Sequence, residues 1–185
     1  MTALRILIVV ALQSAALAYM ILDRQATLNS SRVVTLKVAP VDPRDPFRGD
    51  YVILRYEISQ LDLRQLQGDD KVDQGDTIFV TLQPKGDEWI AVAVARERPF
   101  NVPGGIPVRG TVVSVDSSVA TLPPDRVRVD YGIESYFVPE GTGREIEQER
   151  QKGDLSADIA VDVQGRAAIK AMRRGSEVFY VEGIL

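Results

Sequence analysis

The segment from Pro40 to Ile58 holds the densest group of charged and aromatic side chains in the sequence. Aspartate and arginine alternate in it, three prolines stiffen the backbone, and Gly49 permits a sharp turn into the following strand. Arginine and tyrosine are favoured anchors at interfaces, and a rigid loop loses little entropy when it binds. The pattern predicts a partner-binding loop made of Asp42, Arg44, Asp45, Arg48, Asp50 and Tyr51.

Two other interpretations of the same segment stay open. Aspartates cap turns and arginines pair with them, so the charges would serve only to fix how the chain enters the next strand. A hydrolytic role is the third interpretation, with Asp45 and Asp50 as a carboxylate pair, although no nucleophile stands beside them.

The composition removes most routes to catalysis and one class of partner. The chain has no Cys and no His, which excludes thiol nucleophiles, disulfides, zinc fingers and triads that need imidazole. Its formal net charge is −4 with no basic block, which argues against nucleic acid as a partner. We therefore predict no catalytic residues, no cofactor and no metal.

A membrane-anchored hydrolase of signal-peptidase-like plan is the alternative function, because such an enzyme needs only Ser and Lys, or carboxylates. The candidate serines stand in polar strand-and-turn contexts, and the lysines mostly stand beside charges or turns, which is typical of solvated amines. Calcium binding by an acidic run is the third candidate function, but the run lacks the ligand spacing and the terminal Glu of an EF-hand loop, which favours a solvated loop. The residues are Ser114, Ser117 and Ser118; Lys37, Lys71, Lys85, Lys152 and Lys170; and Asp69, Asp70, Asp73 and Asp76.

The residues from Ile6 to Leu22 carry no charge and predict a membrane anchor. As a helix this run of 17 residues would be about 26 Å long, the short end of a transmembrane span. A cleaved signal peptide would use Ala16-Leu17-Ala18, but the apolar run continues beyond that point. A buried core helix is the other alternative, although the apolar residues lie all round the helix. We predict an uncleaved anchor and juxtamembrane segment at 1–28 and a β-rich domain at 29–185.

The charges that flank the anchor bear on its orientation. Arg5 and the α-amine precede it, and the basic end of an anchor normally stays in the cytoplasm. Arg24 and Arg32 on the other side weaken this bias. We expect a single-pass protein of the membrane lipid bilayer with its carboxy-terminal domain outside the cytoplasm.

The rest of the chain has the period-two alternation of short strands separated by turns. It predicts a mainly β domain, a sandwich or barrel with one short helix, which the capping box Thr142–Glu145 begins. We expect Val52, Leu54, Tyr56 and Ile58 on the core face of one strand over 51–58, and a short helical turn over 60–67. A hairpin is expected over 77–82 and 88–96, with Ile90, Val92 and Val94 on one face of its second strand and Trp89 and three alanines on the other. Further strands are expected over 108–116 and 126–132, followed by a meander from Leu155 to Val181.

One internal similarity stands out. The residues from Leu54 to Ser59 resemble those from Val129 to Ser135 if one gap is allowed. A duplicated β unit is one explanation, and the shared composition of strands is the other. The aromatic residues Tyr131, Tyr136 and Phe137 near the second copy are either a ligand platform or strand packing.

These motifs resemble the GDYXXLXY family of bacterial membrane-anchored proteins of unknown function. Gly49-Asp50-Tyr51, Leu54 and Tyr56 match its signature, and the resemblance extends to 40–45, 131–141 and 162–166. It implies one anchor in the bacterial plasma (inner) membrane and one extracytoplasmic, periplasmic domain. It also implies a multi-pass membrane protein, encoded nearby, as a partner, and it supplies no catalytic residues. The function expected is a non-catalytic binding domain for a membrane or envelope partner.

We predict that the full-length chain depends on detergent for solubility and keeps its amino terminus, because the apolar run continues through Leu22. Intact-mass measurement after expression in a bacterial host tests this. A mature chain that begins near Tyr19 would contradict the anchor and support a cleaved signal peptide.

Overall fold

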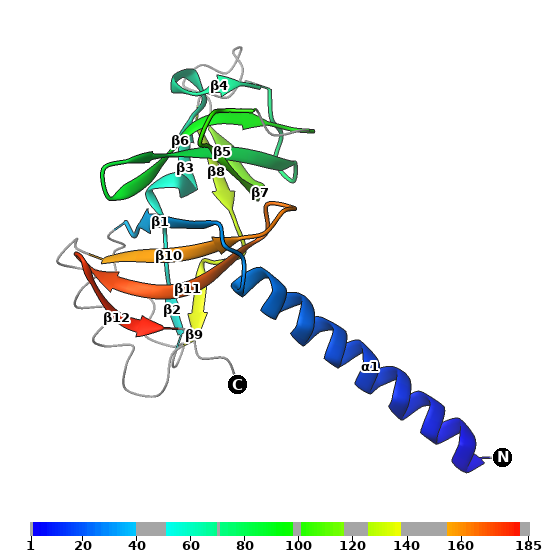
Figure 1. The fold of residues 1–185 in the computed structure, drawn as a ribbon. Coiled ribbons are helices and arrows are strands. Elements are labelled where there is room, and N and C mark those ends of the chain that lie inside the picture. Colours follow the sequence, from blue (N-terminus) through cyan, green and yellow to red (C-terminus); the bar gives the residue numbers. More distant parts are fainter. Residues whose placement is uncertain are drawn as a thin grey trace.

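The computed structural model describes residues 2–39, 51–69, 71–97, 101–116, 126–137 and 155–181. Within these ranges the chain is one long amino-terminal helix followed by curled, mainly antiparallel sheets (Figure 1). The predicted fold class is therefore confirmed. The predicted helix that begins at the capping box Thr142–Glu145 lies outside the described residues.

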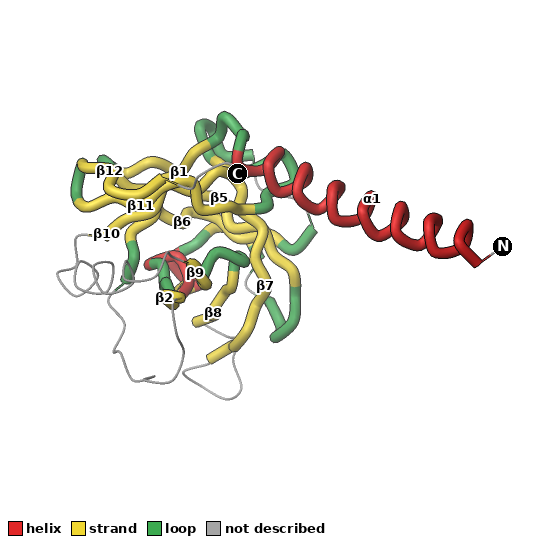
Figure 2. The backbone as a smooth tube through the Cα atoms, turned by 90° about the horizontal axis from the view of Figure 1, so that it is seen from below, coloured by secondary structure: helices red, strands yellow, loops and turns green. Residues whose placement is uncertain are grey.

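Helix α1, Thr2–Leu28, stands apart from the strands as a separate rod in both views (Figures 1 and 2). All its side chains from Leu4 to Leu22 are exposed, and Leu4–Leu28 is long and apolar enough to cross a membrane. The buried core helix is therefore the wrong interpretation of this segment. Such a helix is stable in lipid because it satisfies its backbone hydrogen bonds internally.

The first sheet is antiparallel and has the strand order β1-β10-β11-β12. Its strands confirm the predicted carboxy-terminal meander and the period-two alternation of Val34 and Leu36 in the strand after the helix. Next to it, β2 and β9 form a two-stranded ladder. The bounds are Val33–Lys37 for β1, Leu155–Val161 for β10, Ala167–Arg174 for β11, Glu177–Val181 for β12, Tyr51–Ile53 for β2 and Ser135–Phe137 for β9.

The second sheet has the order β3-β8-β7-β5-β6-β4, antiparallel except for the short β4–β6 pair. It contains the predicted hairpin and the two predicted strands that follow it. The bounds are Gln60–Asp62 for β3, Arg126–Asp130 for β8, Ile106–Asp116 for β7, Thr77–Lys85 for β5, Glu88–Ala95 for β6 and Gln67–Gly68 for β4.

The two sheets bury one continuous core. Leu36 and Ile159 of the first sheet and Ile78 and Leu82 of the second are fully buried in the same cluster. Leu54 and Tyr56 also belong to it, at 0% and 2% exposure, as predicted. The domain is thus held together chiefly by apolar burial between the sheets, the dominant favourable term in folding.

The similarity between the two sequence segments has a structural counterpart, which favours a duplicated unit. Tyr131 stands 75 positions after Tyr56, and the same shift carries β2 (51–53) onto the start of β8 and β3 (60–62) onto β9. The strand pairing has the same symmetry: β2 pairs with β9, and the equivalents of these two strands, β8 and β3, pair with each other. The shift also carries β1 into β7 and β5 onto β10. These strands obey the same exchange, since β1 pairs with β10 and β7 pairs with β5.

Reciprocal hydrogen bonds join the two equivalent segments at the centre. The Tyr56 hydroxyl donates to the Ile133 carbonyl at 3.0 Å, and the Tyr131 hydroxyl donates to the Ile58 carbonyl at 2.8 Å. Each tyrosine therefore bonds the residue two positions after the other. The backbone N–H of Tyr56 also donates to Ser59 Oγ at 3.2 Å, as that of Tyr131 does to Glu134 Oε1 at 2.6 Å.

The predicted strand over 51–58 is shorter than expected. β2 ends at Ile53, and a single bridge between Val38 and Tyr56 precedes a 3₁₀ turn at Glu57–Ser59. The alternation of faces nevertheless holds for the described side chains, because Ile58 is buried and Glu57 is exposed. The burial of Tyr56 thus keeps the predicted inward and outward faces, although a 3₁₀ turn stands where a strand was expected. The helical turn expected over 60–67 is confined to a 3₁₀ turn at Leu63–Gln65 between β3 and β4.

The predicted alternation along β6 is interrupted at Val92. The register shifts between Thr81 and Leu82 of β5, so that Leu82 pairs with Ala91 and Thr81 with Ala93. Val92 is the extra residue, and such a bulge moves the residues before it to the other face. Ile90 is therefore 37% exposed, while Trp89 and Ala91 pack against the core.

We predict that Tyr56→Phe and Tyr131→Phe each destabilise the folded domain by about 1–3 kcal/mol, because each leaves a buried carbonyl without its donor. Chemical unfolding of the full chain in detergent measures the loss, with Tyr19→Phe on the exposed helix as control. If both variants lose less than about 0.5 kcal/mol, the reciprocal bonds do not hold the two segments together.

Candidate functional site

The predicted partner-binding residues Asp42, Arg44, Asp45, Arg48 and Asp50 lie outside the described residues. Tyr51 begins β2, where it pairs with Phe137, and its side chain is not described. The role assigned to these six residues stays a prediction.

Both ends of that segment are described, and they meet. The Ala39 N–H donates to the Arg55 carbonyl at 2.6 Å, and Val38 pairs with Tyr56 beside it. Leu54 continues the β2–β9 ladder by donating its N–H to the Glu134 carbonyl at 2.7 Å. The described residues on either side of this segment therefore meet at one closed stem.

A cleft of about 670 Å³ opens at this stem. Residues that the 75-residue shift relates line it from both halves: Arg55 with Asp130, and Ser59 with Glu134. The cleft therefore lies between the two repeated units. Its wall contains Ala39, Leu54, Arg55, Tyr56, Glu57, Ser59, Gln60, Val113, Arg128, Asp130 and Glu134.

Glu134 is the carboxylate most constrained by the fold in this wall. Its two oxygens accept the N–H groups of Tyr131 at 2.6 Å and of Ile133 at 3.0 Å, across a turn in which Gly132 has φ 76°. Burial raises the pKa of Glu134, and these backbone hydrogen bonds oppose the rise. The carboxylate thus caps the turn that carries Tyr131.

Burial, with the nearby charge of Glu134 as a second cause, raises the pKa of Tyr56 and Tyr131 well above the ordinary tyrosine value. Both hydroxyls therefore stay protonated as donors over the physiological pH range. Since Tyr131 is 5% exposed and its hydroxyl bonds Ile58, strand packing is the correct interpretation of this aromatic residue. The side chains of Tyr136 and Phe137 lie outside the described ones.

The described lining of the cleft offers no nucleophile paired with a base. Ser59 is buried and its Oγ accepts the Tyr56 N–H, while no lysine lines the described wall. Ser114 lies in β7, paired with Arg128 of β8. Ser117, Ser118 and Lys152 lie outside the described residues. What the described wall does offer is exposed charge of both signs, which suits a polar or charged polypeptide segment.

The described lysines are at the surface. Lys37 forms long ion pairs with Glu57 and Glu88, at 3.8 and 4.0 Å. Lys71, Lys85 and Lys170 are exposed. A catalytic lysine needs a desolvated amine, and these positions do not provide one.

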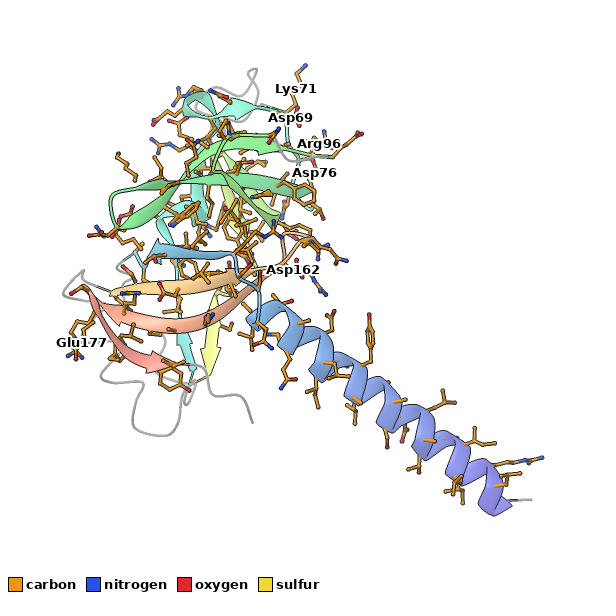
Figure 3. The ribbon with its side chains drawn as sticks, viewed as in Figure 1. Asp69, Lys71, Asp76, Arg96, Asp162 and Glu177 are labelled. Atoms are coloured by element: carbon orange, nitrogen blue, oxygen red, sulfur yellow. The ribbon has the colours of Figure 1, made fainter. Side chains whose placement is uncertain are left out.

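The acidic run is organised by an arginine. Arg96 Nη2 lies 2.9 Å from Asp76 Oδ2, and the Arg96 N–H donates to Asp69 Oδ2 at 2.8 Å (Figure 3). Arg96 also donates to the Lys71 carbonyl, and Asp76 accepts the Asp73 N–H. Among the described residues no three acidic side chains gather as a metal site would require. A surface loop is thus the better interpretation, with Asp70 outside the described residues.

The joint between α1 and the domain is a polar cluster that sequence reasoning did not assign to a site. Arg166, in the β10–β11 connection, bonds both carboxylate oxygens of Asp23 on the helix, with Nη2 2.9 Å from Oδ1. Its Nε lies 2.6 Å from Asp162 Oδ2. The buried Thr27 hydroxyl donates to the same Asp162 oxygen at 3.2 Å. We call these four residues the anchor joint; Figure 3 shows Asp162 where the helix meets the sheet.

Further bonds surround the anchor joint. Arg24 donates to the Ala167 carbonyl at 3.1 Å, and Ser30 donates to the Val161 carbonyl. Asp162 is 9% exposed and accepts the N–H groups of Gln164 and Arg166 as well. Bidentate arginine–carboxylate pairs are directional, so this cluster fixes the angle of the helix as well as its attachment. The spacing of Asp162 and Arg166 is visible in the sequence, but Asp23, which accepts from Arg166, is 143 residues away from it.

The charges of the anchor joint reinforce one another. Burial opposes ionisation of Asp162, but bonds from the Arg166 side chain and from the backbone of Arg166 and Gln164 outweigh it and lower its pKa. The hydrogen bonds that the Arg166 guanidinium donates to Asp23, and then those that it donates to Asp162, raise the pKa of Arg166. Asp162 and Arg166 therefore carry opposite charges at neutral pH.

The sequence was compared with known families, curated proteins and solved structures. A family profile described as "GDYXXLXY protein" matches residues 13–172, most of the chain. The chain belongs to the GDYXXLXY family. No curated protein and no solved structure matches the chain.

The described residues of the GDYXXLXY signature lie in the hydrophobic core or in strand β2 at the stem. Its leucine, Leu54, is fully buried, and its last tyrosine, Tyr56, carries one of the two reciprocal bonds. Its first tyrosine, Tyr51, lies in β2, and Gly49 and Asp50 lie outside the described residues. Leu54 and Tyr56 of the signature thus have a structural role, because they form part of the core of the domain. The similarity noted at 162–166 likewise corresponds to the anchor joint in this GDYXXLXY protein.

We predict that Arg166→Ala loosens the helix from the domain. The chain has no cysteine, so cysteines at Leu12 and Lys85 can carry one spin label each. In lipid nanodiscs the label-to-label distance distribution should be narrow in the parent and broad in Arg166→Ala. Lys170→Ala, which removes an exposed cation of β11, should leave it narrow. An unchanged distribution in Arg166→Ala would show that the joint does not set the helix angle.

Acid should loosen the same joint. The pKa of Asp162 is lowered in the folded chain, so its contribution is complete above the ordinary value of 3.8 and is lost as the pH falls through the lower folded value. The spin-label distribution should therefore stay narrow from pH 7 to 5 and broaden only below about pH 4. Broadening between pH 7 and 5 would mean that another group controls the joint.

Proposed function

We propose that the chain is a non-catalytic, single-pass membrane protein whose domain binds a membrane or envelope partner. The anchor joint carries the proposal. Arg166 bonds Asp23 one residue after the apolar run ends at Leu22, so the domain is held at the membrane surface at a set angle. Fixing a binding surface in place lowers the entropy lost on association.

The proposed location is the outer face of a bacterial inner membrane. Arg5 precedes the uncharged run from Ile6 to Leu22, which favours a cytoplasmic amino-terminal side. The domain would then lie in the periplasm, within reach of the lipid headgroups. A partner held in the same membrane, such as a multi-pass protein, would meet the domain at a fixed height.

The proposed binding surface is the segment over 40–53 together with the cleft at its stem. The described wall of the cleft presents Arg55 and Arg128 beside Glu57 and Asp130, a mixed pattern that favours specificity over non-specific charge attraction. It offers neither the buried lysine nor the paired nucleophile that the alternative hydrolase requires. Binding is therefore better supported than catalysis.

We predict that Arg44→Ala with Arg48→Ala abolishes capture of the native partner by the full-length protein, because two anchor side chains are removed. Capture is measured by affinity purification from detergent-solubilised membranes, at a temperature below the melting point of the variant. Lys85→Ala with Lys170→Ala removes the same charge from exposed positions and should capture normally.

Melting temperature separates recognition from architecture. A recognition role predicts a shift of only a few degrees in the Arg44/Arg48 variant. A sharp drop in melting temperature with capture retained would defeat the proposal and leave the architectural interpretation of the segment.

A further inference from the structure

Gln13 carries a polar side-chain amide at the depth where a membrane is most apolar. It lies ten residues before Asp23 on α1, about 15 Å along the axis, near the middle of a hydrocarbon layer about 30 Å thick. The Gln13 side chain is exposed on the helix surface. Its amide has two donors and an acceptor, which lipid tails cannot satisfy. Ser14 differs, because a serine hydroxyl can bond the carbonyl one turn back.

The direction of Gln13 is set by the helix repeat. Gln13, Met20 and Thr27 follow at seven-residue intervals, so Gln13 lies within about 40° of Thr27 around the axis. Thr27 is buried against the domain and donates to Asp162. The side of the helix that carries Gln13 is thus the side on which the β10–β11 connection is fastened.

This geometry argues against a second copy of the chain as the occupant. Two parallel helices that pack through Gln13 have axes 8–10 Å apart. The last turns of the second helix would then need the space beside Asp23 and Thr27. The connection between Asp162 and Ala167 already fills that space, with bonds to Asp23, Arg24 and Thr27. A helix that leaves the membrane near the level of Met20 meets no such obstacle.

We propose that this side of the anchor binds a transmembrane helix of a different protein, through contact with Val9, Gln13, Leu17 and Met20. We call these four residues the Gln13 face. The partner helix offers an amide, hydroxyl or carboxyl group at mid-membrane depth, and it ends beneath the domain. The inference rests on the proposed function in one respect, that the partner is a membrane protein; it assigns a contact separate from the segment over 40–53.

Photo-crosslinking in intact membranes tests the face. A photoreactive residue is placed in the full-length chain at Leu17 or Met20 on the Gln13 face, or at Ala15 or Leu22 on the opposite side at similar depths. We expect crosslinks to one other polypeptide from Leu17 and Met20 and none from Ala15 and Leu22. Crosslinks from both sides, from the opposite side only, or from no position would overturn the proposal. A crosslinked product made of two copies of this chain would also overturn it.

Substitution of the amide tests its chemistry. Gln13→Leu should lower the Met20 crosslink by about threefold or more, since it removes an interhelical hydrogen bond. Ser14→Ala, the matched loss of a neighbouring polar group, should not change the yield. Equal yields from Gln13→Leu and the parent would overturn the role of Gln13.

The two proposals fail in different ways. If only the domain contact is wrong, Arg44→Ala with Arg48→Ala leaves capture unchanged while the Met20 crosslink still depends on Gln13. If only the membrane contact is wrong, capture is lost in the arginine variant while Leu17 and Met20 give no crosslink that Gln13→Leu reduces.

Discussion

The reciprocal hydrogen bonds of Tyr56 and Tyr131 are the constraint on which the domain depends. They connect two segments 75 positions apart and lie between the β2–β9 and β3–β8 ladders, which belong to different sheets. A buried hydroxyl without a partner is costly, so the two segments have one satisfactory alignment. That alignment sets the register of both ladders, the closed stem at Ala39 and Arg55, and the cleft between the repeated units.

The anchor joint extends this constraint to the amino-terminal helix. Asp23 and Thr27 of the helix are held by Arg166 and Asp162 of the second repeated unit, so the angle of the anchor follows from the fold of the domain. The paired charges explain why a helix can meet the sheet here without apolar packing along its length. In the function that we propose, a membrane partner would bind at two places, the domain surface and the side of the helix beneath it.

The candidate site was predictable only in part. Composition and spacing pointed to the segment from Asp42 to Tyr51, and the structure adds the cleft at its stem without describing Asp42, Arg44, Asp45, Arg48 or Asp50. The anchor joint was missed, because its arginine and its aspartate are 143 residues apart and each is unremarkable in its own neighbourhood. No local pattern reports a pairing that only the folded chain creates.

The sequence alone determined the apolar helix, the β class of the domain, most of its strands and the burial of Leu54 and Tyr56, because these follow from local hydrophobic periodicity. Periodicity did not predict the bulge at Val92, which places Ile90 at the surface. It also did not predict that β2 ends at Ile53, five residues before the end of the expected strand over 51–58. Bulges, strand order and the pairing of the repeated units depend on contacts between distant residues. For that physical reason, only the tertiary structure decided the reciprocal tyrosine bonds, the cleft and the attachment of the anchor to the domain.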